Sequence, residues 1–237
     1  MVIDKNRIIT GFFILFFFLL GYFFKFDFFI LFILTSLVIY ELFKSSFINN
    51  FKDYLIILIF LLLYPLIFYY SQLIYLLNVL FIILVITNLL FSKFFIKRIF
   101  LIIVLILMHN FYFIFYFDRN LLYFVIFVAF FNDTVAYIFG NLLKGPLIIP
   151  QISPKKTWSG TIVSFILTFI LIYQYDYSFF VAILLSISLF VGDIYYSFIK
   201  RQNRLKDFSN LLQSHGGILD RLDSMTFFII ILNFNYL

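Results

Sequence analysis

The sequence predicts an all-α fold, a polytopic transmembrane helical protein. Of its 237 residues, 65% are hydrophobic and only 12% are charged, and the mean hydropathy is +1.13. Apolar runs approach the roughly 20 residues that cross a bilayer core of about 30 Å. A soluble two-layer domain is excluded. The chain has no cysteine, which excludes disulfides, thiolate metal ligands and thiol nucleophiles.

Charges and turn residues divide the apolar runs into about nine predicted spans. The first follows a short charged start and has no small-residue cleavage site after it, so we expect a retained helix rather than a removed signal peptide. We expect a single integral membrane domain over 1–237, with N-terminal transmembrane helices in 1–120 and a catalytic half in 121–237. The predicted spans are 8–24, 28–43, 54–70, 72–91, 99–117, 121–140, 161–175, 178–199 and 224–237.

The basic residues predict the orientation of these spans. All of the 17 Lys and Arg except Lys25 and Arg119 fall on one side of the predicted membrane. By the positive-inside rule, this side is cytoplasmic and carries the N-terminus and the loops 92–98, 141–160 and 200–223. The net charge of +6 is then mainly a topological signal that would also attract anionic lipid headgroups. We expect no nucleic acid partner.

Two carboxylates interrupt apolar spans, Asp133 in FFNDTVAYIFG and Asp193 in SLFVGDIYYSFIK. A charged side chain inside a membrane helix costs about 2.5–3.5 kcal/mol on insertion scales, so by default it faces a partner or a wet cavity and marks a functional site. Both lie towards the cytoplasmic side, where we expect them to meet the 141–160 and 200–223 loops in one pocket. The alternatives are an interhelical hydrogen bond for Asp133 and a solvated helix end for Asp193. The remaining acidic residues fall in predicted loops or at membrane edges.

Asp220 and Asp223 lie three positions apart, just before the last apolar run. If a helix begins near Leu219, this spacing puts both carboxylates on one face of its first turn, where the helix dipole favours anions. Hard oxygen ligands suit Mg²⁺, which takes one or two carboxylates together with substrate phosphate oxygens. The alternative is a helix-capping Asp220 with a solvated Asp223. Together with Asp193 and the basic residues of the loop, the pair favours a metal and phosphate site.

The same loop carries a turn at His215, Gly216 and Gly217. Its glycines permit positive φ angles and a close approach of main-chain N–H groups to an anion. Taken alone, a residue such as His215 is more often a turn residue than a catalyst. His109, far from this loop in the sequence, is expected to form an interhelical hydrogen bond. Ser209 is expected to be accessible from the cytoplasmic side.

The loop 141–160 contains GPLIIPQISPKKTWSGT, which is suited to holding a polyphosphate. A turn is expected at Ser153-Pro154. The alternative is plain positive-inside charge beside a span. The GxxxxGK[ST] loop of P-loop nucleotidases is absent, so the glycine pattern gives no argument for nucleotide binding. The candidate groups are the ammonium groups of Lys155 and Lys156 and the hydroxyl groups of Thr157 and Ser159.

These segments resemble a known family. Residues 197–223, with S-x-x-K-R, K-D and H-G-G-x-x-D-R-x-D, resemble the signature of the phosphatidate cytidylyltransferases, or CDP-diacylglycerol synthases. Residues 133–140 are similar to its DTxAYxxG motif, residues 153–158 match its SPKKTW, and residues 192–197 fit its GDxxxS. The resemblance covers about 130–224, whereas the preceding spans match only in being apolar.

The sequence departs from the family pattern at three places. Tyr196 stands where the family has Glu, Ser159 also stands where it has Glu, and Gln213-Ser214 replace a Pro-Gly. The expected metal carboxylates are intact. The departures therefore concern the geometry around those carboxylates.

The resemblance implies transfer of a CMP group from CTP to phosphatidic acid, giving CDP-diacylglycerol and pyrophosphate. It implies Mg²⁺ as cofactor and leaves open a second cation, with Asp193, Asp220 and Asp223 as ligands. The catalytic set would be these three carboxylates with Lys200 and Arg221. The substrate-binding set would be Ser153, Lys155, Lys156, Thr157, Arg201, Lys206, Asp207, His215, Gly216, Gly217 and Asp133.

The resemblance further implies membrane lipids as partners, a homodimer, and a multi-pass protein of a bacterial-type inner membrane whose active site faces the cytoplasm. Two other functions stay open. A CTP-dependent enzyme could act on another lipid, such as a polyprenol or an archaeal-type lipid, or be a lipid kinase, although SPKKTW favours the diacyl lipid. An ion-coupled transporter could use Asp133 and Asp193, but the sequence shows neither internal repeats nor paired broken helices.

Overall fold

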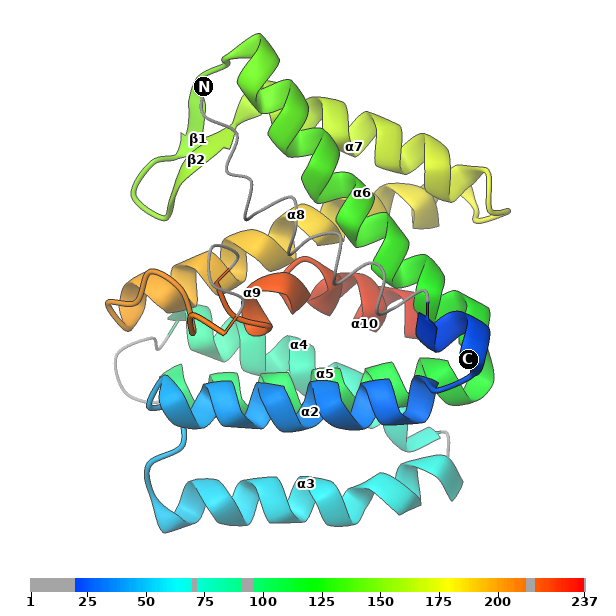
Figure 1. Ribbon diagram of the computed structural model, residues 1–237, viewed down its shortest axis with the longest axis vertical. Helices are drawn as coiled ribbons and strands as arrows, with labels where there is room; N and C mark the ends of the chain where they lie inside the picture. The colour runs from blue at the N-terminus through cyan, green and yellow to red at the C-terminus, as the bar shows by residue number, and fades with distance from the viewer. Residues whose placement is uncertain (1–19, 70–71, 91–95, 212–215, 237) are drawn as a thin grey trace. The chain divides into compact units, whose positions relative to one another are not determined.

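The computed structural model describes residues 20–69, 72–90, 96–211 and 216–236, and these are mostly helical (Figure 1). The chain divides into two compact units. The first comprises Met1–Phe117 and Leu205–Arg221, and the second comprises Asp118–Arg204 and Leu222–Leu237. Residues 205–221 thus group with the N-terminal helices and not with the helices that flank them in the sequence.

Helices α2 to α5 of the first unit lie side by side (Figure 1). Helix α5 is almost continuously buried between Phe100 and Ile114 and contacts each of the other three. Its His109 lies 2.9 Å from the Phe60 carbonyl oxygen of α3 through Nε2, which confirms the expected interhelical hydrogen bond. The helices are α2 (Asp27–Lys44), α3 (Phe51–Tyr69), α4 (Gln72–Leu90) and α5 (Ile96–Phe117).

The described part of the second unit contains four helices of 12–25 residues and one two-stranded sheet. The N-cap side chains fix two helix starts: Asp118 accepts from the Asn120 N–H before α6, and Ser178 accepts from the Val181 N–H before α8. The elements are α6 (Arg119–Leu143), β1 (Leu147–Ile149), β2 (Ser153–Thr157), α7 (Trp158–Tyr173), α8 (Phe179–Gln202) and α10 (Met225–Tyr236). The single turn α9 (Leu219–Leu222) lies where the chain passes from one unit to the other.

Helices α6 and α7 cross at two glycines. A Cβ on Gly160 would lie 2.4 Å from the Ala136 carbonyl oxygen and 2.9 Å from the Gly140 Cα. Farther along, the Thr168 hydroxyl donates to the Asn132 side-chain oxygen across the same pair of helices. Small residues of this kind let two membrane helices approach closely.

The predicted spans agree with the described helices from 28–43 onwards, and the bounds differ by no more than three residues at either end. Most of the predicted span 8–24 lies outside the described residues. Within the described part of the chain, four helices are long and apolar enough to cross a membrane, at Leu73–Leu90, Ile96–Phe117, Arg119–Leu143 and Phe179–Gln202. These helices confirm the coarser part of the prediction, that the chain is a helical polytopic membrane protein. The count of nine spans stays a prediction.

The close crossing of α6 and α7 gives a test of the packing. Replacing Gly160 by Ala forces the two helices apart, because the new methyl group meets main-chain atoms that cannot rotate away. Overpacking of this kind costs about 1–3 kcal/mol, so we expect a clearly lower Tm for the purified protein in detergent. The control is Ile166→Ala, which shortens an exposed side chain on α7 and should change Tm much less. Equal Tm values for Gly160→Ala and the wild type would contradict the crossing.

Candidate functional site

The SPKKT part of the SPKKTW motif forms one arm of a β-hairpin in the second unit, and Trp158 begins α7. Strands β1 and β2 pair antiparallel, with Leu147 opposite Thr157 and Ile149 opposite Ser153. The turn is closed by the Ile152 N–H, which donates to the Ile149 carbonyl oxygen at 3.1 Å. The expected turn at Ser153-Pro154 was therefore wrong. Both residues begin β2, where a proline is tolerated because a two-stranded sheet consists of edge strands.

The base of the hairpin is fixed by two hydroxyl groups. Thr157 is the N-cap of α7, and its Oγ1 accepts from the Gly160 N–H and from the Ser159 hydroxyl. The Ser159 Oγ in turn accepts from the Gly145 N–H at 3.1 Å. Ser159, one of the departures from the family pattern, thus joins the two ends of the hairpin. The Thr157 hydroxyl also has a structural role that its place in the motif did not reveal.

Two contacts attach this hairpin to α8. The Lys156 ammonium forms an ion pair with Asp193 Oδ2 and also lies 5.5 Å from the centre of the Phe190 ring. Arg201, in the last turn of α8, donates through Nε to the Ile152 carbonyl oxygen at 3.1 Å. The Lys156–Asp193 pair joins a predicted phosphate-binding residue to a predicted metal ligand. The alternative that Asp193 is a solvated helix end is wrong, because its carboxylate has a cationic partner. The Lys155 side chain lies outside the described residues.

Helix α8 also packs against the segment that precedes α10. A Cβ on Gly192 would lie 2.4 Å from the Asp223 carbonyl oxygen, so only glycine fits at this crossing. Asp223 is buried, with 6% of its surface exposed, and its Oδ1 accepts from the Ser224 N–H. The alternative of a solvated Asp223 is therefore wrong. The structure brings the residue next to Asp193 onto the backbone of Asp223, so two of the three predicted metal ligands belong to one crossing.

The departure at Tyr196 fills the interior of this crossing. Its ring is fully buried, and its hydroxyl receives a hydrogen bond of 3.0 Å from Thr226 on α10. Ser197, the next residue, donates to Asp193 Oδ1 at 3.5 Å, and Lys200 on the following turn is buried. Tyr196 thus contributes a hydrogen bond between α8 and α10 at the position where the family pattern has a carboxylate.

Asp220 lies in the first unit, and its carboxylate organises the segment before it. Its Oδ2 accepts from the Gly217 N–H at 2.9 Å and from the Phe208 N–H at 3.0 Å. Gly216 has a φ of +77°, and a Cβ there would lie 2.9 Å from the same oxygen. The glycine turn does approach an anion closely, as the sequence suggests, but this anion is a carboxylate of the protein itself. The helix that begins at Leu219 is the single turn α9, so Asp220 and Asp223 do not share one helix face as expected.

The N-terminal half contributes a residue that the sequence interpretation missed. Glu41 of α2 is completely buried and accepts hydrogen bonds from residues 209, 218 and 219 of the first unit. A signal was present, because Glu41 falls inside the predicted span 28–43, and an ionisable residue within a span marks a functional site by default. Its position close to the end of that span led to its being grouped with membrane-edge residues.

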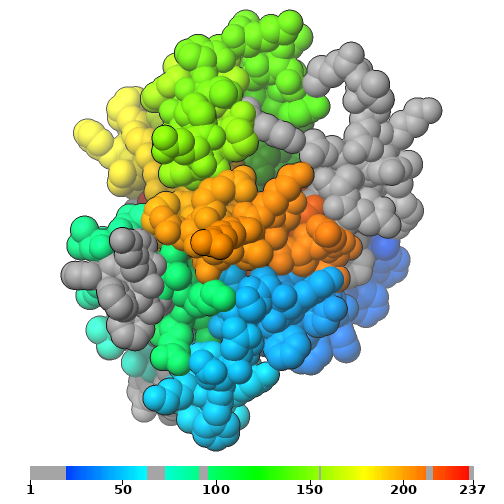
Figure 2. Space-filling view, turned by 90° about the vertical axis from the view of Figure 1, so that its left-hand side faces the viewer, coloured from blue at the N-terminus to red at the C-terminus, as the bar shows by residue number. Residues whose placement is uncertain are grey.

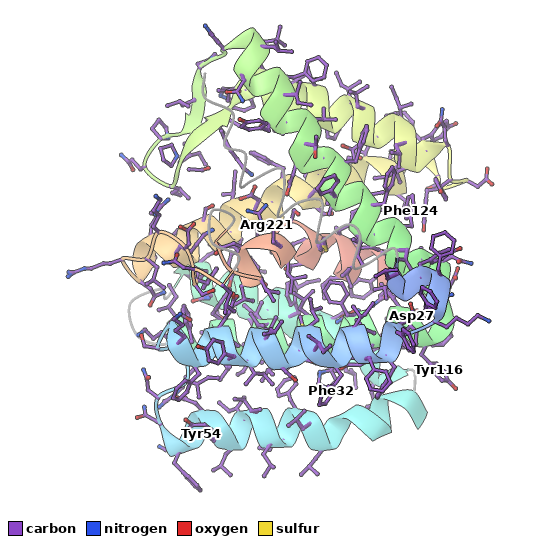
Figure 3. All side chains as sticks on the ribbon, viewed as in Figure 1. Asp27, Phe32, Tyr54, Tyr116, Phe124 and Arg221 are labelled. Atoms are coloured by element: carbon purple, nitrogen blue, oxygen red, sulfur yellow. The ribbon has the colours of Figure 1, made fainter. Side chains whose placement is uncertain are left out.

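The remaining predicted cations are at the surface. Arg201, Lys206 and Arg221 are exposed. The orange segment of Figure 2, which includes the C-terminal part of α8 and residues that follow it, is exposed on the face in view, and Figure 3 labels Arg221 on α9. Asp133 on α6, Ser153 and Asp207 are partly exposed. His215, with Gln213 and Ser214, lies outside the described residues. Ser209 is buried, so its expected accessibility is wrong, whereas the adjacent Asn210 is exposed.

The carboxylates have the donor chemistry that Mg²⁺ requires, although each has protein partners. Asp193 and Asp223 belong to the second unit and Asp220 to the first. Among the described residues, no three His, Cys, Asp or Glu side chains form a group that could hold a metal ion. Hard oxygen atoms nevertheless fit Mg²⁺ better than any other ligand type in this cysteine-free chain.

Comparison with known proteins gives a consistent result. A family model described as the cytidylyltransferase family matches residues 5–237. A phosphatidate cytidylyltransferase of Rickettsia bellii is 36% identical over 44% of this chain and 52% of that protein. A protein with the same name from Rickettsia conorii is 35% identical over 47% of this chain and 55% of that protein. One from Staphylococcus haemolyticus is 38% identical over 46% of each chain. The chain spans about half the length of the curated relatives it matches. From the match over nearly its whole length, the chain belongs to the cytidylyltransferase family.

Proposed function

We propose that this chain is a phosphatidate cytidylyltransferase, which transfers the CMP group of CTP to phosphatidic acid and releases pyrophosphate. Family membership and the names of the relatives support this activity over an ion-coupled transporter. Within the chain, the observation that carries the proposal is the crossing in the second unit. There, Lys156 of the SPKKTW hairpin pairs with Asp193, and Gly192 packs on the backbone of the buried Asp223.

The chemistry requires positive charge more than it requires a base. A phosphate oxygen of phosphatidic acid attacks the α-phosphorus of CTP, and the bond from that phosphorus to the oxygen bridging to the β-phosphate breaks. Pyrophosphate leaves with the bonding electrons. The nucleophile is already ionised at neutral pH, so the protein has to bring two polyanions together in line and stabilise charge in the transition state.

The carboxylates Asp193, Asp220 and Asp223 would hold Mg²⁺. The proposal leaves open whether a second cation binds with it. Bound Mg²⁺ would neutralise charge on the phosphate oxygens. Lys156 can exchange Asp193 for a substrate phosphate, because both present anionic oxygens to its ammonium group. Lys200, Arg201, Lys206 and Arg221 supply further positive charge at the end of α8, in the loop that follows it and on α9.

Two residues of the proposed substrate-binding set also serve the protein's own structure. The Thr157 hydroxyl caps α7, and the Gly217 N–H donates to Asp220. We infer that they shape the site by holding the hairpin and the glycine turn in place. The diacyl chains of the lipid would stay in the leaflet, while the headgroup reaches cations on the cytoplasmic side. A homodimer, implied by the family resemblance, remains part of the proposal.

Replacement of Asp223 by Asn tests the proposed activity. The change is nearly isosteric but removes the charge of a buried carboxylate, so we expect phosphatidate-dependent release of pyrophosphate from CTP to fall by roughly 10²–10³-fold or more. The assay uses purified full-length protein with phosphatidate and Mg²⁺.

The matched control is Asp176→Asn, the same chemical change at an exposed turn residue whose φ of 62° suits Asn equally well. This control should retain wild-type activity. Undiminished activity of Asp223→Asn would remove Asp223 from the mechanism. No phosphatidate-dependent activity in the wild type would refute the proposed function itself.

The sidedness of the site is tested by a single introduced cysteine in this cysteine-free chain. We expect a cysteine at the exposed Asn210 to react with a membrane-impermeant maleimide only from the cytoplasmic side. A cysteine at the adjacent buried Ser209 should react far more slowly in the same preparation. Reaction of the Asn210 variant from the outside of intact cells would contradict the orientation, and equal rates at the two positions would contradict the burial of Ser209.

A further inference from the structure

Glu41 is a fully buried carboxylate in the N-terminal helices, at a distance in sequence from every family motif. Its Oε1 accepts from the Ser209 hydroxyl at 2.5 Å and from the Ile218 N–H at 2.6 Å, and its Oε2 accepts from the Leu219 N–H at 2.8 Å. A buried charge is costly unless it is hydrogen-bonded, and bonds to a charged acceptor are stronger than neutral ones. All of these donors belong to residues 205–221, which we call the signature loop.

The contacts of Glu41 alternate with those of Asp220. Asp220 accepts from Phe208 and Gly217, and Glu41 accepts from the residues that follow them, Ser209 and Ile218. Each of the two carboxylates therefore binds both described segments of the signature loop, the one before residue 212 and the one after residue 215. A displacement of either segment would move the N–H groups that orient Asp220.

The glycine pair is shaped to fit these two carboxylates. A Cβ on Gly217 would lie 2.5 Å from Glu41 Oε1, and a Cβ on Gly216 would lie 2.9 Å from Asp220 Oδ2. Each glycine thus packs against one carboxylate, and neither position has room for a side chain. Glu41 accordingly accounts for the requirement for glycine at Gly217, which a role in substrate binding alone would not explain.

An aromatic cluster adds an apolar anchor to the same loop. The Phe208 ring stacks on Phe100 of α5, with centroids 5.4 Å apart and planes within 2° of parallel. It also contacts Phe47, which follows α2, at 5.9 Å. The loop segment that contains Ser209 is therefore fixed to the N-terminal helices by packing as well as by Glu41.

We propose that Glu41 is a positioning residue of the active site, which acts by fixing the signature loop so that Asp220 is held in a productive orientation. The proposal rests on the proposed function for its effect on catalysis, but its effect on the loop can be measured separately. It gives the N-terminal helices, which lie outside the motifs at residues 133–223, a specific part in the chemistry.

The experiment compares full-length purified Glu41→Gln and Ser209→Ala with the wild type. Glu41→Gln keeps the shape and one acceptor oxygen but loses the charge. Ser209→Ala removes one donor to Glu41, together with the oxygen that accepts from the Leu211 N–H, and it serves as a milder variant should Glu41→Gln fold poorly. Three quantities are measured: Tm, amide hydrogen exchange of peptides covering 205–221, and the Mg²⁺ dependence of CTP turnover.

The matched control is Asp53→Asn, which removes another buried carboxylate of the same unit. Asp53 accepts from the Asn49 and Asn50 N–H groups and from Arg98, none of which belongs to the signature loop. Burial raises the pKa of Asp53, but these hydrogen bonds outweigh that effect and hold its pKa below the ordinary value of 3.8. The carboxylate therefore stabilises the fold above its unfolded-state pKa, and the control should lower Tm at neutral pH.

We expect Glu41→Gln to speed exchange in the signature loop and to lower turnover and apparent Mg²⁺ affinity by roughly 10–100-fold, the range typical of groups that orient metal ligands. Ser209→Ala should change the same quantities in the same direction by less. Asp53→Asn should lower Tm but leave loop exchange and Mg²⁺ dependence as in the wild type.

Two results would overturn the proposal. One is wild-type loop exchange in both Glu41→Gln and Ser209→Ala. The other is that Asp53→Asn, at an equal loss of Tm, changes loop exchange and Mg²⁺ dependence as much as Glu41→Gln does. Glu41 would then contribute only to general stability. If the wild type has no cytidylyltransferase activity, the proposed function fails, while loop exchange still decides whether Glu41 fixes the signature loop.

Discussion

A carboxylate buried in a chain this apolar needs hydrogen-bond donors or a cation within reach, and this need organises the site. Three acidic residues, Glu41, Asp220 and Asp193, meet the requirement by binding segments that are separated from one another in the sequence. Glu41 binds the signature loop to α2, Asp220 joins the two segments of that loop, and Asp193 binds the SPKKTW hairpin to α8. The charged groups that suit the chemistry are thus also the groups that hold the motifs in place.

Close packing at positions without a side chain is the second requirement, and glycine meets it in both units. Gly140 and Gly160 let α6 and α7 cross, and Gly192 lets α8 reach the backbone of Asp223. In the first unit, Gly217 leaves space for the Glu41 carboxylate. Several glycines of the family motifs are therefore explained by packing, whereas the acidic residues beside them carry the proposed chemistry.

The helices could be predicted closely from the sequence, because long apolar runs interrupted by charge leave few alternatives in a membrane protein. The β-hairpin could not, because residues 147–157 are too short and too polar to give a periodic signal. The break between α9 and α10 was also missed, since the spacing of Asp220 and Asp223 suits one continuous helix. Among the candidate site residues, Asp193 and Asp223 were predicted from residue type and context, and their roles stay predictions. Glu41 was not predicted, because its partners are more than 160 positions away in the chain.

The most direct test of the proposed function follows the two ends of the CTP triphosphate. Purified protein is incubated with phosphatidate, Mg²⁺ and CTP that carries radioactive phosphorus at either the α or the γ position, and the lipid is then separated from the aqueous phase. Cytidylyl transfer predicts that the α label enters the lipid and the γ label leaves as pyrophosphate. Entry of the γ label into the lipid, as a CTP-dependent kinase would give, or no transfer of either label, would contradict the account.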